Sequence, residues 1–362
     1  MRQPARNIVN QTSTAGPLRR RLLITAPGKV ELVEERLPGL GEHDVYARTI
    51  VSGISHGTEI AWLDGSAASL HRTWDAGRRI YLDGPGRGYP VAPGYESIGK
   101  VTQVGRSVTG VRVGDLIAID APHADAHLLT GGAATAGLLS AGVGVEQAVF
   151  FTLARVALGG VHDVTLSLGE TVVIMGLGTV GLLAAQQARH VGAWVIGVDR
   201  YPLRLAAAEA FGLTPVLAAP GADVAARVRD LTGPAGADAA VEASGFYAGL
   251  HEAIRCVGVG GRVATVASYR GDQPGLRLGE EYHRNRITLI SSMTINGCPQ
   301  RNHPTWTLDR LNAAARRLIL TGAVRTERLI THRIPFERAA EAYALITDTP
   351  ANTIKVVLTY DN

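Results

Sequence analysis

The stretch TVVIMGLGTVGLLAAQQARHVGAWVIGVD, residues 171–199, decides the fold. Thr171 is followed by the apolar run VVIM, which predicts a buried parallel strand, and a glycine-rich turn comes directly after it. The run of Ala, Leu and Gln from residue 182 to residue 191 is typical of a helix, and a second apolar strand ends on Asp199. Strand, glycine turn, helix, strand and acid in this order predict a dinucleotide-binding unit.

Each glycine of the turn has a physical role in this prediction. Gly176 allows the tight turn, Gly178 lets the backbone approach a pyrophosphate, and Gly181 lets the helix pack close to the strand. The free N–H groups at the start of the helix, around Thr179 and Val180, favour an anion at that point. We therefore expect these five residues to contact the cofactor.

The acid that ends the second strand predicts which cofactor binds. Asp199 falls where a carboxylate accepts hydrogen bonds from both ribose hydroxyls, and its charge repels a 2′-phosphate. We therefore expect NAD. NADP stays open as the alternative, because Arg200 and Arg204 follow closely and could hold a phosphate.

The overall composition limits the class of protein. A chain of 362 residues with 46% hydrophobic and 19% charged residues predicts a globular protein of two domains. Part of the net charge of +4 lies in a basic N-terminal arm, so we expect no nucleic-acid partner. Cys256 and Cys298 exclude a four-cysteine zinc site and a disulfide framework. Without a signal peptide or membrane span, the expected location is the cytoplasm, and the expected partner is a small molecule.

The regions flanking the decisive stretch predict two architectures. Short strands at residues 21–24, 30–35 and 44–52, a polar loop at 64–89 and later glycine-punctuated strands are typical of a small β-barrel. After Asp199, apolar runs at 215–217, 238–242, 261–266 and 287–292 bring the expected parallel strands to six. Because the carboxyl ends of such strands line the ligand crevice, the residues there are either cofactor contacts or ordinary loop residues. These residues are Ser244, Ala267 and Ser292.

Several motifs resemble the medium-chain dehydrogenase/reductase superfamily, the zinc-type alcohol dehydrogenase-like proteins. The motifs are Gly94-Tyr95-Glu96, a Val-Gly turn, a Val-Gly-Asp turn, the late glycine motif and the closing segments at 329–335 and 354–358. The resemblance covers about residues 21–360. It implies an α/β fold with a GroES-like β-barrel catalytic domain and a doubly wound Rossmann domain, and a cleft between them for cofactor and substrate.

The resemblance also implies a division of the chain and an assembly. We expect a flexible arm at 1–20, the catalytic domain at 21–152, the Rossmann domain at 153–295 and a return to the catalytic domain at 296–362. Members of the family commonly pair through the edge strand, here residues 287–292, so we expect a homodimer or homotetramer. The motifs GISxGTE and GYPxxPGYE are most similar to the subgroup that includes the bacteriochlorophyllide hydroxyethyl dehydrogenases. That substrate is not carried over, because the loop at 64–89 differs.

The metal ligands of the zinc-dependent branch are missing. That branch has a Cys, a His and a Cys or Glu where this chain has Ser55, Tyr95 and Phe151. A serine hydroxyl is a poor zinc ligand, a phenol is rarely one, and a phenyl ring is none. His123 and His127 are four residues apart, which suits a metal only on a helix. We therefore expect a zinc-free member of the family, with no metal.

Without zinc, another group must polarise the substrate oxygen and move its proton. The resemblance directs Tyr95 and Ser55 into the cleft, where either hydroxyl can hydrogen-bond that oxygen. Glu96 is a candidate to orient Tyr95 or accept the proton, and His56 has the intrinsic pKa that suits proton relay. Arg155 falls where the family contacts the nicotinamide face. Packing, surface contacts or a domain-interface ion pair are the alternative roles of these residues.

These expectations combine into one function and two alternatives. The first is an NAD-dependent, zinc-independent alcohol dehydrogenase or ketone reductase (EC 1.1.1.-) that acts on a secondary alcohol. Arginines, histidines, tyrosines and acids at 64–89 and 270–286 favour a polar substrate such as a sugar, a cyclitol or a biosynthetic intermediate. The alternatives are an NADPH-dependent quinone or enoyl reductase and a nucleotide-binding protein without turnover.

Overall fold

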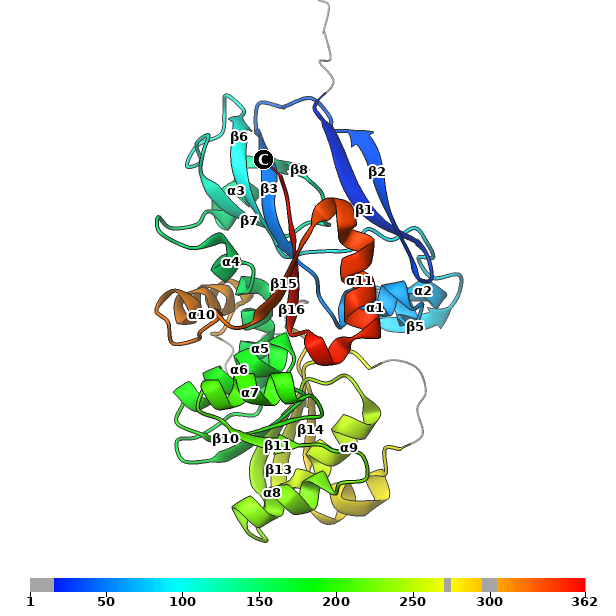
Figure 1. Cartoon of the computed structure of the whole chain (residues 1–362), viewed down its shortest axis with the longest axis vertical. Coiled ribbons are helices and arrows are strands. Elements are labelled where there is room, and N and C mark those ends of the chain that lie inside the picture. The colour runs from blue at the N-terminus through cyan, green and yellow to red at the C-terminus, as the bar shows by residue number, and fades with distance from the viewer. Residues whose placement is uncertain (1–15, 270–274, 295–304, 362) are drawn as a thin grey trace, which may run out of the picture.

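The computed structural model describes residues 16–269, 275–294 and 305–361, and it contains a β-barrel part and a parallel-sheet part (Figure 1). The expected N-terminal arm lies outside these ranges up to residue 15. The first strand, β1, begins at Leu18, three residues earlier than the sequence predicts. It pairs antiparallel with β2 (Lys29–Arg36), and the single Gly28 at φ +72° helps to form the tight turn between them.

Six strands form the main sheet of the barrel part. The order is β15-β16-β3-β6-β7, and β8 pairs with β3. The C-terminal segment thus returns to the barrel: β16 lies antiparallel to β3, with Leu358 opposite Ser52. The six strands are β3 (Asp44–Gly53), β6 (Ser97–Val104), β7 (Leu116–Ile119), β8 (Ala126–Thr130), β15 (Ile330–Pro335) and β16 (Lys355–Thr359), whereas β1 (Leu18–Ala26) forms a separate two-stranded sheet with β2.

The segment expected as a polar loop, residues 64–89, has secondary structure of its own. It contains the short helix α2 (Ala68–His71) and the hairpin β4 (Arg72–Asp75) and β5 (Ile80–Asp83), in which Trp74 packs edge-on against Tyr81. The prediction of a loop was wrong because these cross-strand partners were not recognised as a pair. The other short helices of the barrel part are α1 (Thr58–Leu63), α3 (Gly131–Gly137) and α4 (Val145–Ala148).

The six-stranded parallel sheet confirms the predicted α/β fold. Its order is β11-β10-β9-β12-β13-β14, with β9 and β12 at the centre. The strands are β9 (Thr171–Met175), β10 (Trp194–Asp199), β11 (Thr214–Leu217), β12 (Ala237–Glu242), β13 (Val257–Thr265) and β14 (Thr288–Ser291). The helices of the chain from this point are α5 (Phe151–Asp163), α6 (Thr179–His190), α7 (Pro202–Ala210), α8 (Val224–Thr232), α9 (Tyr247–Cys256), α10 (Leu308–Leu320) and α11 (Ala339–Asp348). The π-helix η1 (Leu278–Tyr282) and the 3-10 turns η3 (Phe336–Arg338) and η4 (Pro350–Asn352) are further elements of the described residues.

Successive side chains of β9 point to opposite faces of the sheet, and helices cover both faces. Val172 and Ile174 belong to a hydrophobic cluster with α5, α6 and α7, whereas Val173 and Met175 belong to a cluster with α8 and α9. The first cluster continues through α5 to barrel residues such as Ile98. Helix α5 therefore joins the two parts, and the carboxyl ends of the parallel strands face the barrel (Figure 1). Within the described ranges, no helix has the length and apolar character that crossing a membrane requires.

Candidate functional site

The glycine turn after β9 is open to an approaching ligand at one of its three glycines, Gly178. A Cβ on Gly181 would lie 1.8 Å from the carbonyl oxygen of Gly176, and a Cβ on Gly176 (φ +91°) would lie 2.7 Å from the backbone nitrogen of Ser244. A Cβ on Gly178 meets no atom within 4 Å. Gly178 is the N-cap of α6 and offers no side-chain cap, so the first N–H groups, at Thr179 and Val180, remain for another partner. This open cradle fits the pyrophosphate of a dinucleotide.

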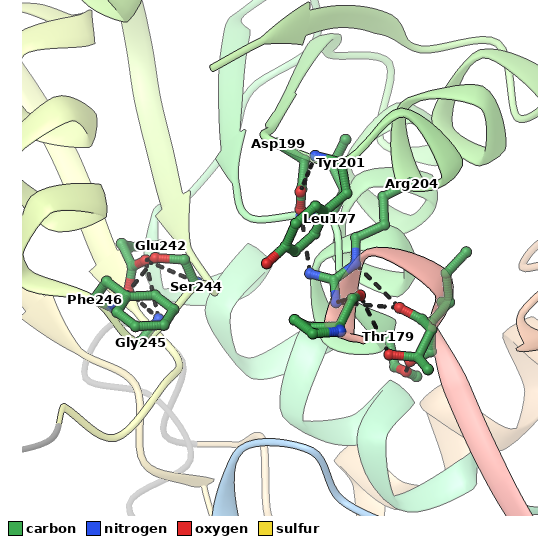
Figure 2. A network of polar contacts seen from close by, with 12 residues as sticks. Leu177, Thr179, Asp199, Tyr201, Arg204, Glu242, Ser244, Gly245 and Phe246 are labelled. Atoms are coloured by element: carbon green, nitrogen blue, oxygen red, sulfur yellow. Dashed lines mark hydrogen bonds and ion pairs between the residues drawn. The ribbon is translucent and has the colours of Figure 1, made fainter. Parts of the chain in front are cut away.

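The acid at the end of β10 is held by the backbone of this turn. Asp199 is buried, and its carboxylate accepts the N–H of Leu177 at 2.7 Å and the N–H of Tyr201 at 2.9 Å (Figure 2). These bonds fix the carboxylate next to the glycine turn. Each oxygen keeps a further lone pair that can accept a ribose hydroxyl.

The two arginines after Asp199 differ in their contacts. The Arg204 guanidinium lies 3.6 Å from the Asp199 carboxylate and donates to the carbonyl oxygens of Pro350 and Thr353 at 3.1 Å (Figure 2). Arg204 therefore ties α7 to the segment before β16. Arg200 instead stacks over the rings of Tyr201 and Phe246, at 4.8 and 5.5 Å.

The residues at the ends of the later strands have different environments. Ser244 donates its hydroxyl to the buried carboxylate of Glu242, which also accepts the N–H groups of Ser244 and Gly245 (Figure 2). Burial raises the pKa of Glu242. Ala267 lies beside Gly245, since a Cβ built on Gly245 would lie 3.4 Å from the Cβ of Ala267. Ser292 is buried with its hydroxyl unpartnered. Glu242 was missed by the sequence reasoning, although an acid in an apolar strand signals a buried polar role.

The candidate donor hydroxyl lies against a serine. Tyr95 donates its hydroxyl to Ser55 Oγ at 2.5 Å, so the structure brings together two of the residues placed at the metal-ligand positions. The backbone N–H of Ser55 in turn donates to the Glu59 carboxylate at 2.8 Å. Burial, followed by the charge of Glu96, raises the pKa of Tyr95 far above its ordinary value. Tyr95 therefore stays protonated and available as a donor.

Glu96 forms no hydrogen bond with Tyr95 among the described residues, so its role in orienting Tyr95 stays a prediction. Its carboxylate pairs with the Lys355 ammonium at 2.8 Å, and both side chains are fully buried. Lys355 also donates to the carbonyl oxygen of Ile54 at 3.0 Å. Pairing of β16 with β3 brings this lysine to Glu96 from 259 residues away in the chain. Burial raises the pKa of Glu96 to about 7 even though the charge of Lys355 lowers it.

A second buried acid holds the histidine that was considered as a metal ligand. Glu59 accepts the hydroxyl of Tyr343 and lies 3.1 Å from His123 Nε2, while His123 Nδ1 lies 2.7 Å from Ser52 Oγ. Burial acts to raise the pKa of Glu59, but His123 and the hydrogen bonds hold it below its ordinary value. His127 lies in the strand β8, so the helical spacing is not realised. Both ring nitrogens of His123 are engaged.

His56 follows Ser55 and is partly buried. Removal from water, together with the positive charges of Lys355 and Arg204, holds the pKa of His56 well below its ordinary value. The imidazole is therefore neutral at neutral pH and a weaker proton acceptor than its intrinsic pKa indicates. The electrostatics count against the relay role predicted for it.

Arg155 lies on α5, one turn after Phe151, and is only 7% exposed. Its Nη1 donates to the side-chain oxygen of Asn312 at 3.3 Å, while Nε and Nη2 have no hydrogen-bond partner among the residues that the structure describes. Within the described part of the chain it forms no ion pair, so the domain-interface ion pair considered for it is not found.

The donor set does not fit zinc. Ser55 and Tyr95 are bonded to each other, and Phe151 is buried in the hydrophobic cluster against which Tyr95 packs. Among the described residues, one group brings three metal-compatible side chains within 4.8 Å, and it lies in the parallel-sheet part. Its members are His251, Glu280 and Glu281. Arg277 contacts the first two of them, at 3.2 and 3.3 Å.

Comparison with known proteins adds family matches to this geometry. The family described as alcohol dehydrogenase GroES-like domain matches residues 66–166, and the family described as zinc-binding dehydrogenase matches residues 179–312. D-guloside 3-dehydrogenase of Escherichia coli (strain K12) is 28% identical over 350 residues, which cover 94% of this chain and 100% of that protein. Sorbitol dehydrogenase 1 of Saccharomyces cerevisiae is 30% identical over 295 residues, which cover 70% of this chain and 77% of that protein.

Solved structures share the fold. Galactitol-1-phosphate dehydrogenase from Escherichia coli superimposes with a TM-score of 0.73 at 21% identity, covering 94% of this chain and 99% of its own. 2R,3R-butanediol dehydrogenase from Bacillus subtilis gives 0.75 at 18% identity, covering 95% and 100%. At these identities the likeness concerns the fold alone.

Proposed function

This chain belongs to the medium-chain dehydrogenase/reductase superfamily, in which it is an alcohol dehydrogenase-like oxidoreductase, and from that premise we propose that it interconverts a secondary alcohol and a ketone with NAD(H) and without zinc. The hydrogen bond between Tyr95 and Ser55 carries the proposal. It joins a protonated phenol to a hydroxyl at the two positions that we align with metal ligands of the zinc-dependent branch. A phenol aimed at the substrate oxygen stabilises developing alkoxide without a metal.

The cofactor is held by the glycine turn and the acid after it. The N–H groups of Thr179 and Val180 would bind the pyrophosphate over the open side of Gly178, and Asp199 would accept the ribose hydroxyls. The bound nicotinamide supplies or accepts the hydride. Ser244, Ala267 and Ser292 lie at the same edge of the sheet, where they complete the proposed cofactor side.

The proton chemistry rests on this chain's own groups. Tyr95 would donate its hydroxyl hydrogen bond to the substrate oxygen, and the Ser55 hydroxyl would then turn to donate to Tyr95. The N–H of Ser55 bonded to Glu59 keeps this serine in place. Glu96, whose pKa is near 7, is the nearby group that can change protonation at neutral pH.

The substrate we propose is polar, such as a sugar, a cyclitol or a biosynthetic intermediate. The family relatives named for D-guloside and sorbitol support a polyhydroxylated molecule. Part of the arginine-rich segment that suggested such a substrate, residues 270–274, lies outside the described residues. We propose that the enzyme works in the cytoplasm.

Cofactor preference tests the role of Asp199. We expect NADH to bind at least about tenfold more tightly than NADPH, because the fixed carboxylate repels a 2′-phosphate and Arg204 is occupied by the carbonyl oxygens of Pro350 and Thr353. Titration of nicotinamide fluorescence measures both affinities, and Asp199→Ala should narrow the gap. Tighter binding of NADPH would contradict the proposal and favour an NADPH-dependent quinone or enoyl reductase.

Metal content tests the zinc-free site. Since Ser55 and Tyr95 satisfy each other and Phe151 offers no ligand atom, we expect well under one zinc ion per chain by elemental analysis. Zinc at one ion per chain, lost together with activity on dialysis against a chelator, would overturn the assignment of all three positions.

We also propose a homodimer or homotetramer that pairs through β14. This strand ends the parallel sheet in the part of the chain that the structure describes, and its Leu289 is 37% exposed. An edge strand presents unpaired N–H and C=O groups, which an equivalent strand of a second subunit covers by twofold symmetry. Light scattering at micromolar protein should give at least twice the chain mass, and a monomeric mass would refute the pairing.

A further inference from the structure

Arg155 is an unusual arginine because most of its guanidinium is buried without a partner. Nε and Nη2 are closed to solvent and unbonded, and the bond from Nη1 to Asn312 is long, at 3.3 Å. Burying a cation costs free energy unless hydrogen bonds and an opposite charge compensate for it. Burial accordingly lowers the pKa of Arg155. Two of the three guanidinium nitrogens of Arg155 thus have donor capacity that no described residue uses.

A second arginine lies beside it. Arg316, on α10, stacks over the ring of Phe151 at 5.4 Å and donates to the carbonyl oxygen of Ala136 at 3.2 Å. Burial and the charge of Arg155 lower the pKa of Arg316, so the two guanidinium groups repel each other. Asp120 acts electrostatically on Arg155, but within the described ranges no carboxylate lies within 4.0 Å of either arginine. Two arginines near the start of α5, with no carboxylate at ion-pair distance among the described residues, favour the binding of an anion.

The position of this pair relates it to the reacting oxygen. Arg155 lies one helical turn after Phe151, and Phe151 and Tyr95 stand at two of the three positions that we align with metal ligands of the zinc-dependent branch. Helix α5, which carries Arg155, joins the barrel to the parallel sheet, and Tyr95 packs against the same hydrophobic cluster. An anion bound by Arg155 would therefore be one end of a small molecule whose other part reaches the Tyr95 hydroxyl.

We propose that Arg155, with Arg316 beside it, binds an anionic group of the substrate, a carboxylate or a phosphate, while Tyr95 contacts the reacting oxygen; this inference rests on the proposed dehydrogenase function. Both anions match the forked N–H geometry of a guanidinium, which binds them through paired, charge-assisted hydrogen bonds. The preferred substrate is thus an acidic or phosphorylated polyhydroxylated molecule and not a neutral one. Because Nε and Nη2 are closed to solvent, binding requires the Arg155 side chain or the groups around it to move.

Two matched series of sugars test the proposal. The first is D-glucose, D-glucuronate and D-glucose 6-phosphate, and the second is methyl D-guloside with the same three groups at C6. Calorimetry on the NADH-saturated enzyme measures each Kd, and oxidation with NAD measures kcat/KM. We expect a charged sugar to bind about tenfold more tightly than its neutral counterpart, because a charge-assisted hydrogen bond is worth about that much. Comparison of carboxylate with phosphate identifies which anion fits.

Variants link the preference to the arginines. Arg155→Gln should bring charged and neutral sugars within about threefold and leave NADH affinity unchanged, and Arg155→Lys, which keeps the charge without the fork, should retain part of the preference. Arg317→Gln is the matched control, because Arg317 follows Arg316 on α10 but is exposed, so the variant removes an arginine charge outside the proposed subsite and should leave the preference intact.

The outcomes distinguish a failure of the anion subsite from a failure of the proposed dehydrogenase function. Equal or tighter binding of the neutral sugars in both series overturns the anion subsite. A loss of NADH affinity in Arg155→Gln with an unchanged sugar preference also overturns it, and makes Arg155 a cofactor contact. A charge preference that disappears in Arg155→Gln, in an enzyme that oxidises no sugar or alcohol, supports the subsite and refutes the proposed dehydrogenase activity.

Discussion

Tyr95→Phe lowers kcat and kcat/KM together by about 10²- to 10³-fold and leaves NADH affinity unchanged. The substitution keeps the ring that packs against the hydrophobic cluster and removes only the hydroxyl that now bonds Ser55. Loss of a donor that acts mainly in the transition state affects turnover more than binding. Steady-state kinetics with a deuterated alcohol measures the loss and shows whether hydride transfer limits the rate.

Matched variants make this result specific. Tyr89→Phe is the control, because Tyr89 is another partly buried tyrosine of the barrel part and bonds only the carbonyl oxygen of Trp62 in the contacts described, at 2.6 Å. It should leave kcat unchanged. Ser55→Ala should cost less than Tyr95→Phe, since it removes the group that positions the donor. If Tyr95→Phe keeps turnover within about tenfold while the isotope effect is expressed, Tyr95 is a packing residue.

Lys355→Met should lower the free energy of unfolding by about 3–5 kcal/mol. The change leaves the Glu96 carboxylate buried without its cation, and that carboxylate is 0% exposed. Chemical denaturation monitored by circular dichroism measures the loss. The double variant Lys355→Met/Glu96→Gln should recover much of it, because no charge is then buried. Arg338→Met is the surface control: its pair with Glu341 is exposed, so the loss should stay within about 0.5 kcal/mol.

The pH dependence of this loss follows from the pKa of Glu96. Burial raises that pKa to about 7, above its ordinary value of 4.5, so the stabilising contribution of the protonated form is complete below about pH 4.5 and disappears as the pH rises through about 7. Without the positive charge of Lys355, the buried Glu96 carboxyl loses its proton only at a higher pH. The destabilisation by Lys355→Met should therefore be smallest near pH 5 and largest above pH 7. A loss independent of pH would show that lost packing, not an unpaired carboxylate, is responsible.

The parts of the fold that the sequence predicted well depend on local patterns. The strand, turn and helix from Thr171 to His190 follow from an apolar run, a glycine spacing and helical residues within one short stretch, and the structure has them at those positions. The hairpin at residues 72–83 was missed because its evidence is cross-strand: Trp74 and Tyr81 face each other only after the chain has turned.

The parts of the site that could not be predicted depend on contacts between distant segments. The partner of Glu96 is Lys355, and one of the partners of Glu59 is Tyr343, each brought from the C-terminal region by the return of the chain to the barrel. The one available signal was a lysine in the otherwise apolar run IKVVL, since a buried strand tolerates a cation only beside an acid. For His56, the neighbouring positive charges that hold its pKa down also come from distant segments.

The most direct test of the account is alcohol oxidation by the zinc-depleted wild-type enzyme. Protein dialysed against a chelator and checked by elemental analysis is mixed with NAD and a panel of sugars, sugar acids, sugar phosphates and polyols, and formation of NADH is followed beside the Tyr95→Phe variant. We expect the wild-type enzyme to form NADH at the same rate before and after dialysis and the variant to be nearly inactive. An enzyme that loses its activity on dialysis and regains it when zinc is added would contradict it.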